Sequence, residues 1–206
     1  MFYTIFRSIR HKIIKAYRAS GSGKKVTSEK ARIREEVKRM KFLMPHEEKF
    51  AQAALVYAKI EAMPEFQKAN TILMYWSMPD ELPTHDFIVK WSESKTILLP
   101  VVKGKQMVVR KFTGIDDLKK GQFKTLEPGS GTFSRNIADL VIAPGIAFDK
   151  HKRRMGRGGG YYDRYLKNKQ IPTWGIGFSF QLFDFIPSAP FDVQMTRVIT
   201  PDQTVG

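Results

Sequence analysis

Apolar residues recur along this chain at two spacings, one typical of helices and one typical of buried strands. Helical spacing predicts helices over residues 28–42, 45–64 and 83–91. Ser28 is suited to cap the first helix, and Pro45 and Pro83 are suited to open the other two, because proline is tolerated in a first helical turn. The first half of the chain is therefore expected to be rich in helix.

Short apolar runs bounded by turn residues predict strands over residues 71–76, 96–102, 139–144 and 173–178, with a short last strand near Val198. A hairpin at Lys103-Gly104-Lys105 leads into a further strand over residues 106–112. Residues 113–136 are read as an excursion at the rim of the sheet, and a short helix is expected to end near Lys167. Strands that alternate with helices predict an α/β fold whose mostly parallel sheet is covered on both faces.

Composition limits what such a fold can be. The 206 residues are 42% hydrophobic, which is enough for one sizeable core and favours a single globular domain. There is no cysteine, so disulfides, thiolate catalysis and sulfur-ligated metals are excluded. This composition also fits a reducing compartment, and a cytoplasmic location is the expectation.

The net charge of +15 attracts polyanions, but it is unevenly distributed. Residues 1–25 hold seven basic side chains and no acid, which leaves 28 basic residues against 20 acidic ones elsewhere, a net charge of +8. Apolar residues at helical spacing make this arm amphipathic, and a linker-like sequence follows it. We therefore divide the chain into an arm and linker over residues 1–27 and a globular domain over residues 28–206.

The role of the arm stays open on sequence grounds. It could pack on the domain or fray, because a short isolated helix is marginal in water. It could also lie on an anionic membrane, bind a partner or act as an organelle address. The chain has no run of transmembrane length, and its start lacks the apolar core and cleavage site of a secretory signal.

The strongest chemical signal is the segment Arg154 to Asp163, which reads RMGRGGGYYD. Four glycines in five positions allow backbone N–H groups to approach one anion, and a following helix would add the positive end of its dipole. Arg154 and Arg157 supply forked donors suited to phosphate, and Asp163 could hold the magnesium that accompanies a nucleoside triphosphate. The segment is neither a Walker loop nor a dinucleotide fingerprint, so a flexible loop or a contact to nucleic-acid phosphates remains an alternative.

Together with the preceding residues 143–149, which read APGIAFD, this segment resembles the signature of the 5-formyltetrahydrofolate cyclo-ligase family, also called methenyltetrahydrofolate synthetases. A weaker similarity extends from about Lys30 to Thr200. The resemblance implies a single-domain three-layer α/β sandwich. It also implies the conversion of 5-formyltetrahydrofolate and ATP into 5,10-methenyltetrahydrofolate, ADP and phosphate, with Mg²⁺.

The resemblance also implies a set of site residues. The implied nucleotide contacts are Lys30, Arg34, Arg154, Met155, Gly156, Arg157, Gly158, Gly159, Gly160, Tyr161 and Tyr162. The implied folate contacts are Trp76, Glu81, Phe123, Tyr161 and Tyr162. The implied Mg²⁺ ligands are Asp163 and Asp192, although Thr196 stands where the family commonly has an acidic residue.

In the implied reaction the formyl oxygen attacks the γ-phosphate, and a folate nitrogen then closes the ring as phosphate leaves. Arg154 and Arg157 would act catalytically by stabilising phosphate charge, because phosphoryl transfer needs positioning and charge neutralisation more than a protein nucleophile. We expect a monomer that takes a small-molecule folate, which can carry a polyglutamate tail, and that has no obligate nucleic acid.

Two other functions compete with this one. A nucleic-acid-binding module is favoured by the charge of +15 but lacks a recognised motif. Another ATP-using enzyme on the same fold would bind ATP and ignore formylfolate.

Overall fold

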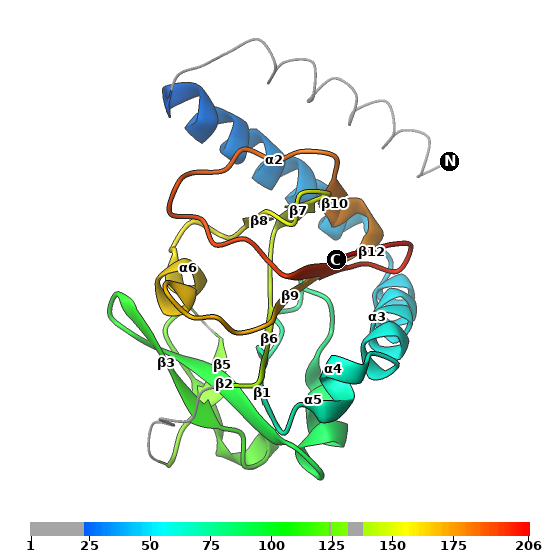
Figure 1. Cartoon of the computed structure of the whole chain (residues 1–206), viewed down its shortest axis with the longest axis vertical. Coiled ribbons are helices and arrows are strands. Elements are labelled where there is room, and N and C mark those ends of the chain that lie inside the picture. The colour runs from blue at the N-terminus through cyan, green and yellow to red at the C-terminus, as the bar shows by residue number, and fades with distance from the viewer. Residues whose placement is uncertain (1–22, 124, 132–137) are drawn as a thin grey trace.

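A seven-stranded sheet forms the centre of the computed structural model, which describes residues 23–123, 125–131 and 138–206. Its order is β12-β11-β9-β6-β1-β2-β3 (Figure 1). The strands are β1 (Thr71–Leu73), β2 (Thr96–Lys103), β3 (Gln106–Lys111), β6 (Leu140–Ala143), β9 (Thr173–Ile176), β11 (Arg197–Ile199) and β12 (Thr204–Val205). The five inner strands run parallel, and β3 and β12 add antiparallel edges. The predicted α/β fold with a mostly parallel sheet is confirmed.

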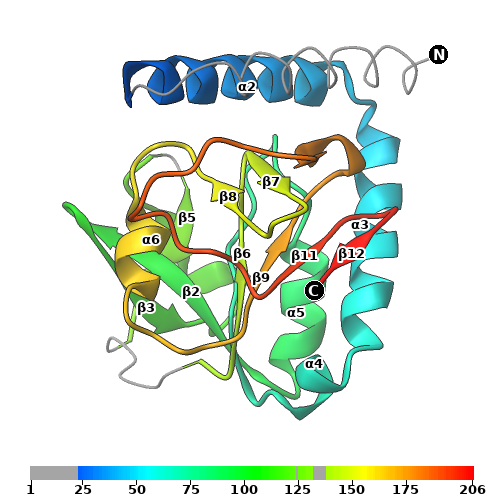
Figure 2. The same cartoon turned by 45° about the horizontal axis from the view of Figure 1, so that its top comes forward.

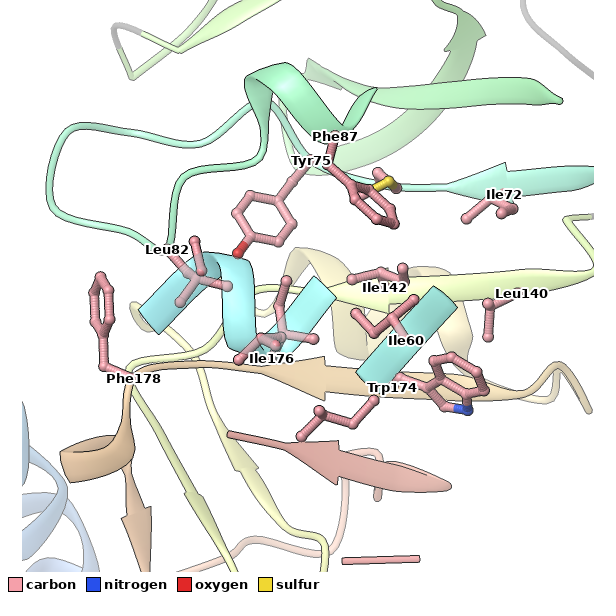
Figure 3. Packing of buried hydrophobic residues seen from close by; sticks show 14 of the residues in the cluster. Ile60, Ile72, Tyr75, Leu82, Phe87, Leu140, Ile142, Trp174, Ile176 and Phe178 are labelled. Atoms are coloured by element: carbon pink, nitrogen blue, oxygen red, sulfur yellow. The ribbon is translucent and has the colours of Figure 1, made fainter. Parts of the chain in front are cut away.

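Successive residues of the short inner strands bury opposite faces of this sheet, because side chains alternate along a strand. Ile72 and Ile142 belong to one buried cluster, whereas their neighbours Leu73 and Val141 belong to another. Figure 3 shows part of the first cluster, which includes Ile60 as well as Ile142. Both faces of the sheet are therefore apolar, as expected for a sheet between two layers.

The helices divide between the two faces. The first face is covered by α3 (His46–Glu61), α4 (Pro64–Lys68) and α5 (His85–Ser92), whose buried residues join the first cluster. The second is covered by the short α6 (Tyr161–Leu166), and Figure 2 shows α6 on the opposite side of the sheet from α3 and α4. A small sheet of order β10-β7-β8 lies near the carboxyl ends of the parallel strands. It is formed by β7 (Ala147–Asp149), β8 (Arg154–Met155) and β10 (Leu182–Phe183).

One long helix, α2 (Gly23–Leu43), lies outside these layers and crosses the top of the molecule (Figure 2). It contacts β7 and the 3₁₀ turn Ser179–Gln181, and it buries Ile33 and Val37 against the first cluster. The predicted helix start at Ser28 is wrong, because nothing after Gly23 breaks a helix and Ser28 lies inside it. The predicted boundary at residue 27 therefore falls within α2, and residues 1–22 of the predicted arm lie outside the described residues.

Other boundaries also differ from the prediction. The strand predicted over residues 71–76 ends at Leu73, and Pro64 opens α4 instead of ending a helix. The excursion carries a 3₁₀ turn (Ile115–Asp117) and an antiparallel pair, β4 (Leu118–Lys120) with β5 (Leu126–Pro128). The glycine-rich segment begins in β8 of the small sheet, a strand that the sequence pattern did not predict.

A close contact between the two sheets fixes the position of β7. The ring of Phe148 is fully buried, and a Cβ atom added at Gly175 of β9 would lie 2.2 Å from its Cε1 atom. We expect Gly175→Ala to lower the free energy of unfolding by about 1–3 kcal/mol, because overpacking shifts the ring and the strand that carries it. Urea unfolding followed by circular dichroism measures this change.

A second substitution separates this contact from a general effect on β9. Phe148→Leu should cost less in the Gly175→Ala background than in the wild type, since the smaller side chain relieves the clash. Equal costs in the two backgrounds would show that the two residues do not compete for space.

Candidate active site

Three loops meet beneath α2 at the carboxyl ends of the parallel strands, where open α/β sheets bind their ligands. They are the loop after β1 (residues 74–84), the glycine-rich loop between β8 and α6 (residues 156–160) and the segment before β11 that contains residues 188–193. Basic side chains of α2 reach all three loops. The predicted site residues are drawn together largely by these contacts.

The glycine-rich loop is anchored at its start by a buried ion pair. Arg154 Nη2 lies 2.9 Å from Asp163 Oδ1, and Arg154 Nη1 donates to the carbonyl oxygen of Pro144 at 3.2 Å. The Arg154 side chain is 4% exposed, so the pair closes the loop between β8 and α6 in a desolvated setting. Arg154 is therefore already neutralised by Asp163 before any phosphate arrives.

Two polar atoms beside this pair lack partners. Within the described part of the chain, Arg154 Nε and the Tyr162 hydroxyl are buried and make no hydrogen bond. The Arg154 guanidinium carbon lies 5.4 Å from the centre of the Tyr162 ring, so both atoms belong to one region. Buried donors are normally satisfied, and a ligand or a water molecule at this point would satisfy them. Burial also raises the pKa of Tyr162, which keeps its hydroxyl protonated as a donor.

The loop itself needs glycine at two positions. Gly158 and Gly160 have φ values of 109° and 65°, which residues other than glycine rarely adopt. The Gly156 carbonyl oxygen accepts a hydrogen bond of 3.1 Å from Arg34 Nε, which ties the loop to α2. The predicted contribution of a helix dipole is small, because α6 has only six residues. The backbone N–H groups and the arginines are therefore the candidate anion-binding features of this loop.

Arg157 connects the glycine-rich loop to the loop after β1. Its Nη2 atom lies 2.7 Å from Asp80 Oδ1 and 3.1 Å from Glu81 Oε1. The other oxygen of Glu81, Oε2, accepts a hydrogen bond of 3.0 Å from the backbone N–H of Met78. Partial burial would lower the pKa of Arg157, but the two carboxylates outweigh it and raise that pKa. A predicted phosphate contact and a predicted folate contact are thus bound to each other.

Sequence reasoning missed two members of this charged group. Asp80 pairs with Arg157 and also accepts a hydrogen bond of 3.4 Å from Lys41 Nζ on α2. Although burial opposes it, attraction to Lys41 and Arg157 lowers the pKa of Asp80. Lys41 could have been found from its spacing, since it lies on the same face of α2 as Lys30 and Arg34.

The two predicted Mg²⁺ ligands are close in the structure. Asp163 Oδ1 accepts a hydrogen bond of 3.2 Å from the N–H of Val193, the residue after Asp192. Asp192 Oδ2 lies 2.6 Å from Lys30 Nζ. Within the described residues, Asp163 Oδ2 and Asp192 Oδ1 take part in no hydrogen bond, and no group of three or more His, Cys, Asp or Glu could hold a metal ion.

This donor set fits one kind of magnesium binding. Two nearby carboxylates with free oxygens suit a Mg²⁺ ion that arrives with nucleotide phosphates and keeps several waters. They do not form an all-protein cage.

Three of the predicted aromatic folate contacts lie in two separate groups. Phe123, which has a φ of 72° and is 57% exposed, meets the ring of Tyr161 edge-on with 5.8 Å between centroids. The Tyr161 hydroxyl donates to the Gly104 carbonyl oxygen at 3.0 Å. Trp76 instead stacks with His85 at 4.2 Å and with Phe112 at 5.6 Å. The first group offers an open aromatic surface, and Trp76 is largely occupied by its neighbours.

Two further positions have structural contacts. The Met155 side chain is 2% exposed and lies in the core, so a nucleotide contact there would come from the backbone. Thr196 hydrogen-bonds through Oγ1 to the backbone N–H and C=O of Thr173 at the start of β9. The residue that departs from the family pattern therefore ties the segment before β11 to the start of the inner strand β9.

Fold and site together define the class. A parallel α/β sheet carries, at the carboxyl ends of its strands, an arginine- and glycine-rich anion loop next to carboxylates and an exposed aromatic surface. This arrangement is typical of an α/β enzyme that brings a phosphate-bearing ligand to a second, partly aromatic ligand.

Comparisons with known proteins give the family. The sequence pattern described as the 5-formyltetrahydrofolate cyclo-ligase family matches residues 26–201. A 5-formyltetrahydrofolate cyclo-ligase of Mus musculus is 29% identical over 195 residues, which cover 86% of this chain and 96% of the relative. The chain therefore belongs to the 5-formyltetrahydrofolate cyclo-ligase family and is an enzyme of that class.

Two solved structures of 5,10-methenyltetrahydrofolate synthetases have a fold similar to that of this chain. The 5,10-methenyltetrahydrofolate synthetase of Aquifex aeolicus superimposes with a TM-score of 0.77 at 27% identity, covering 85% of this chain and 91% of that one. The synthetase of Mycoplasma pneumoniae gives a TM-score of 0.65 at 25% identity, covering 84% and 98%. Among the described residues, no helix is long and apolar enough to cross a membrane.

The Arg154–Asp163 pair gives a stability prediction. We expect Asp163→Ala to lower the free energy of unfolding by about 3 kcal/mol, because it leaves the Arg154 charge buried without its counter-charge. Equilibrium urea unfolding measures the loss. Glu35→Ala is the matched control, since the Glu35–Lys38 pair is exposed on α2 and contributes little. Equal losses in the two variants would mean that the buried pair has no special weight.

Proposed function

We propose that this enzyme catalyses the ATP-dependent cyclisation of 5-formyltetrahydrofolate to 5,10-methenyltetrahydrofolate, with release of ADP and phosphate. Family membership supports the cyclo-ligase chemistry, and two relatives of known structure are 5,10-methenyltetrahydrofolate synthetases. One observation carries the proposal for this chain: Arg157 of the anion loop is bound to Glu81, at the boundary between the proposed nucleotide and folate sites.

In the proposed reaction, the formyl oxygen attacks the γ-phosphorus and ADP leaves. The second folate nitrogen then attacks the formyl carbon, and the C–O bond breaks as phosphate departs. The glycine N–H groups and Lys30 would hold the phosphates, while Arg154 and Arg157 stabilise the charge that develops during transfer. Asp163 and Asp192 would hold Mg²⁺, which supplies further neutralisation of the phosphates.

The folate would lie on the side of Asp80, Glu81 and Arg157 that faces away from the nucleotide phosphates. Glu81, 12% exposed and oriented by the Met78 N–H, is suited to accept hydrogen bonds from the pterin ring. Phe123 and Tyr161 would form one wall, and the buried Tyr162 hydroxyl, which has no partner among the described residues, could donate a hydrogen bond to the ligand. This assignment needs Arg157 to exchange carboxylates for phosphate when the nucleotide binds.

Pairing within the site argues against a nucleic-acid interface. Lys30, Arg154 and Arg157 each lie within 3.1 Å of a carboxylate oxygen. Side chains arranged in this way present little net charge to a polyanion. A small ligand that enters the site can exchange these partners one by one.

Turnover tests the proposal directly. With Mg-ATP and 5-formyltetrahydrofolate, the wild type should form the methenyl product, followed by its near-ultraviolet absorbance. Arg157→Met should lower kcat/KM by about 10²–10³-fold, because it removes a donor that stabilises transferring charge. Arg32→Met, which removes an arginine of α2 paired with Glu29, is the control and should keep the wild-type rate. Folded wild-type protein that binds ATP and gives no product would refute the activity.

The N-terminal arm is proposed to be dispensable for catalysis. The family match begins at residue 26 and α2 at Gly23, so a chain that starts at residue 23 keeps both. We expect deletion of residues 1–22 to leave kcat and KM within about twofold of the full chain, since the family match and every proposed site residue lie outside the deleted segment. A large loss of activity would place the arm in the catalytic unit.

For the full chain we propose a monomer that takes mono- or polyglutamylated folate. We also propose that it works in the cytoplasm, because a cysteine-free chain fits a reducing compartment. Comparing where the full chain and the chain without residues 1–22 are found in fractionated cells tests whether those residues change the location of the protein.

A further inference from the structure

Lys41 is a buried lysine to which the proposed chemistry assigns no role. Its side chain is 3% exposed, and its Nζ atom lies 3.4 Å from Asp80 Oδ2. Burial lowers the pKa of Lys41, although attraction to Asp80 and Glu81 opposes this. A charge held at such a desolvation cost is unusual in a helix whose other face is open to solvent.

The position of Lys41 on α2 relates it to the candidate active site. Lys30, Arg34 and Lys41 are separated by four and seven residues, so they share one face of the helix. Each reaches a different loop: Lys30 contacts Asp192, Arg34 contacts the Gly156 carbonyl, and Lys41 contacts Asp80. The helix thus presents one cation to every loop of the site.

Asp80 is shared between two cations through its two oxygens. Oδ1 lies 2.7 Å from Arg157 Nη2, and Oδ2 faces Lys41. Lys41 comes from a helix that is fixed in the core by Ile33 and Val37, whereas Arg157 comes from the glycine-rich loop. One counter-charge of Asp80 is therefore permanent, and the other is exchangeable.

This sharing matters when Arg157 turns to phosphate, a step that rests on the proposed function. The move takes Arg157 from Asp80 and Glu81, which would leave two neighbouring carboxylates without a cation. With Lys41 in place, Asp80 keeps a counter-charge after Arg157 leaves. Without Lys41, Asp80 would hold Arg157 more strongly and oppose its transfer.

We propose that Lys41 is a positioning residue, which acts through Asp80 to keep Arg157 free to move from the loop after β1 to the nucleotide phosphates. It touches neither ligand. Its effect is to lower the cost of separating Arg157 from Asp80.

Nucleotide binding tests this role through a double-mutant cycle. We expect Lys41→Met, which keeps a long buried side chain without charge, to raise the dissociation constant for Mg-ATP about 10-fold, within the usual range of coupling between contacting residues. In the Asp80→Asn background, the same Lys41→Met change should alter that constant by less than about twofold, because no carboxylate remains at position 80 to retain Arg157. Isothermal titration calorimetry of the purified proteins with Mg-ATP gives all four constants.

Lys38→Met is the control for this test. It removes a lysine of the same helix whose side chain is 79% exposed, and the variant should bind Mg-ATP like the wild type. Circular dichroism melts confirm that each variant is folded at the titration temperature. The inference is overturned if folded Lys41→Met binds Mg-ATP as tightly as the wild type, or if its 10-fold loss persists with Asp80→Asn.

Failure of the proposed function is distinguishable from failure of this role. A wild type that binds Mg-ATP and forms no methenyl product contradicts the proposed reaction, while the four dissociation constants still decide the role of Lys41. A wild type that binds no Mg-ATP overturns both.

Discussion

The buried ion pair between Arg154 and Asp163 is the contact on which the arrangement of the site depends. An arginine with 4% of its side chain exposed is tolerable only beside a counter-charge, since an isolated buried ion costs several kcal/mol. The pair closes the glycine-rich loop onto α6. Asp163 also accepts the Val193 N–H, and the adjacent Asp192 binds Lys30 of α2. One buried charge thus connects the loop, the short helix, the segment before β11 and the long helix above them.

A consequence is that the site is held together by its own charges. Arg157 and Lys30 each already have a carboxylate partner, so phosphate binding at the proposed site would be an exchange of partners and not a simple gain of contacts. The free energy of such an exchange is smaller than that of a new ion pair in the same place. Binding is instead favoured by a smaller loss of conformational entropy, because charged side chains that are already held near their targets lose little freedom when the ligand binds.

The main strands and the glycine-rich segment could be predicted from the sequence, whereas the small sheet could not, for a physical reason. The main strands are runs of buried apolar residues, and the glycine-rich segment has a composition that few other structures need, so both were found. β7, β8 and β10 have two or three residues each, which is too short for a periodic pattern to show.

The partners of the charged residues were beyond sequence reasoning for another reason. Lys41 meets Asp80 across 39 positions and Lys30 meets Asp192 across 162, and only the completed fold brings them together. The early start of α2 was missed because Ser28 is a suitable cap that the chain does not use.

The way in which α2 is attached explains how partner exchange can occur without disturbing the fold. Ile33 and Val37 hold the helix against the core, and this apolar contact is indifferent to the charge state of the site. Lys30, Arg34 and Lys41 flank those residues on the same side and reach outward to the three loops. Since the helix axis is fixed by packing, only side chains and the glycine-rich loop need to move when ligands enter. The apolar stripe supplies the rigidity, and the basic stripe supplies contacts that can be replaced.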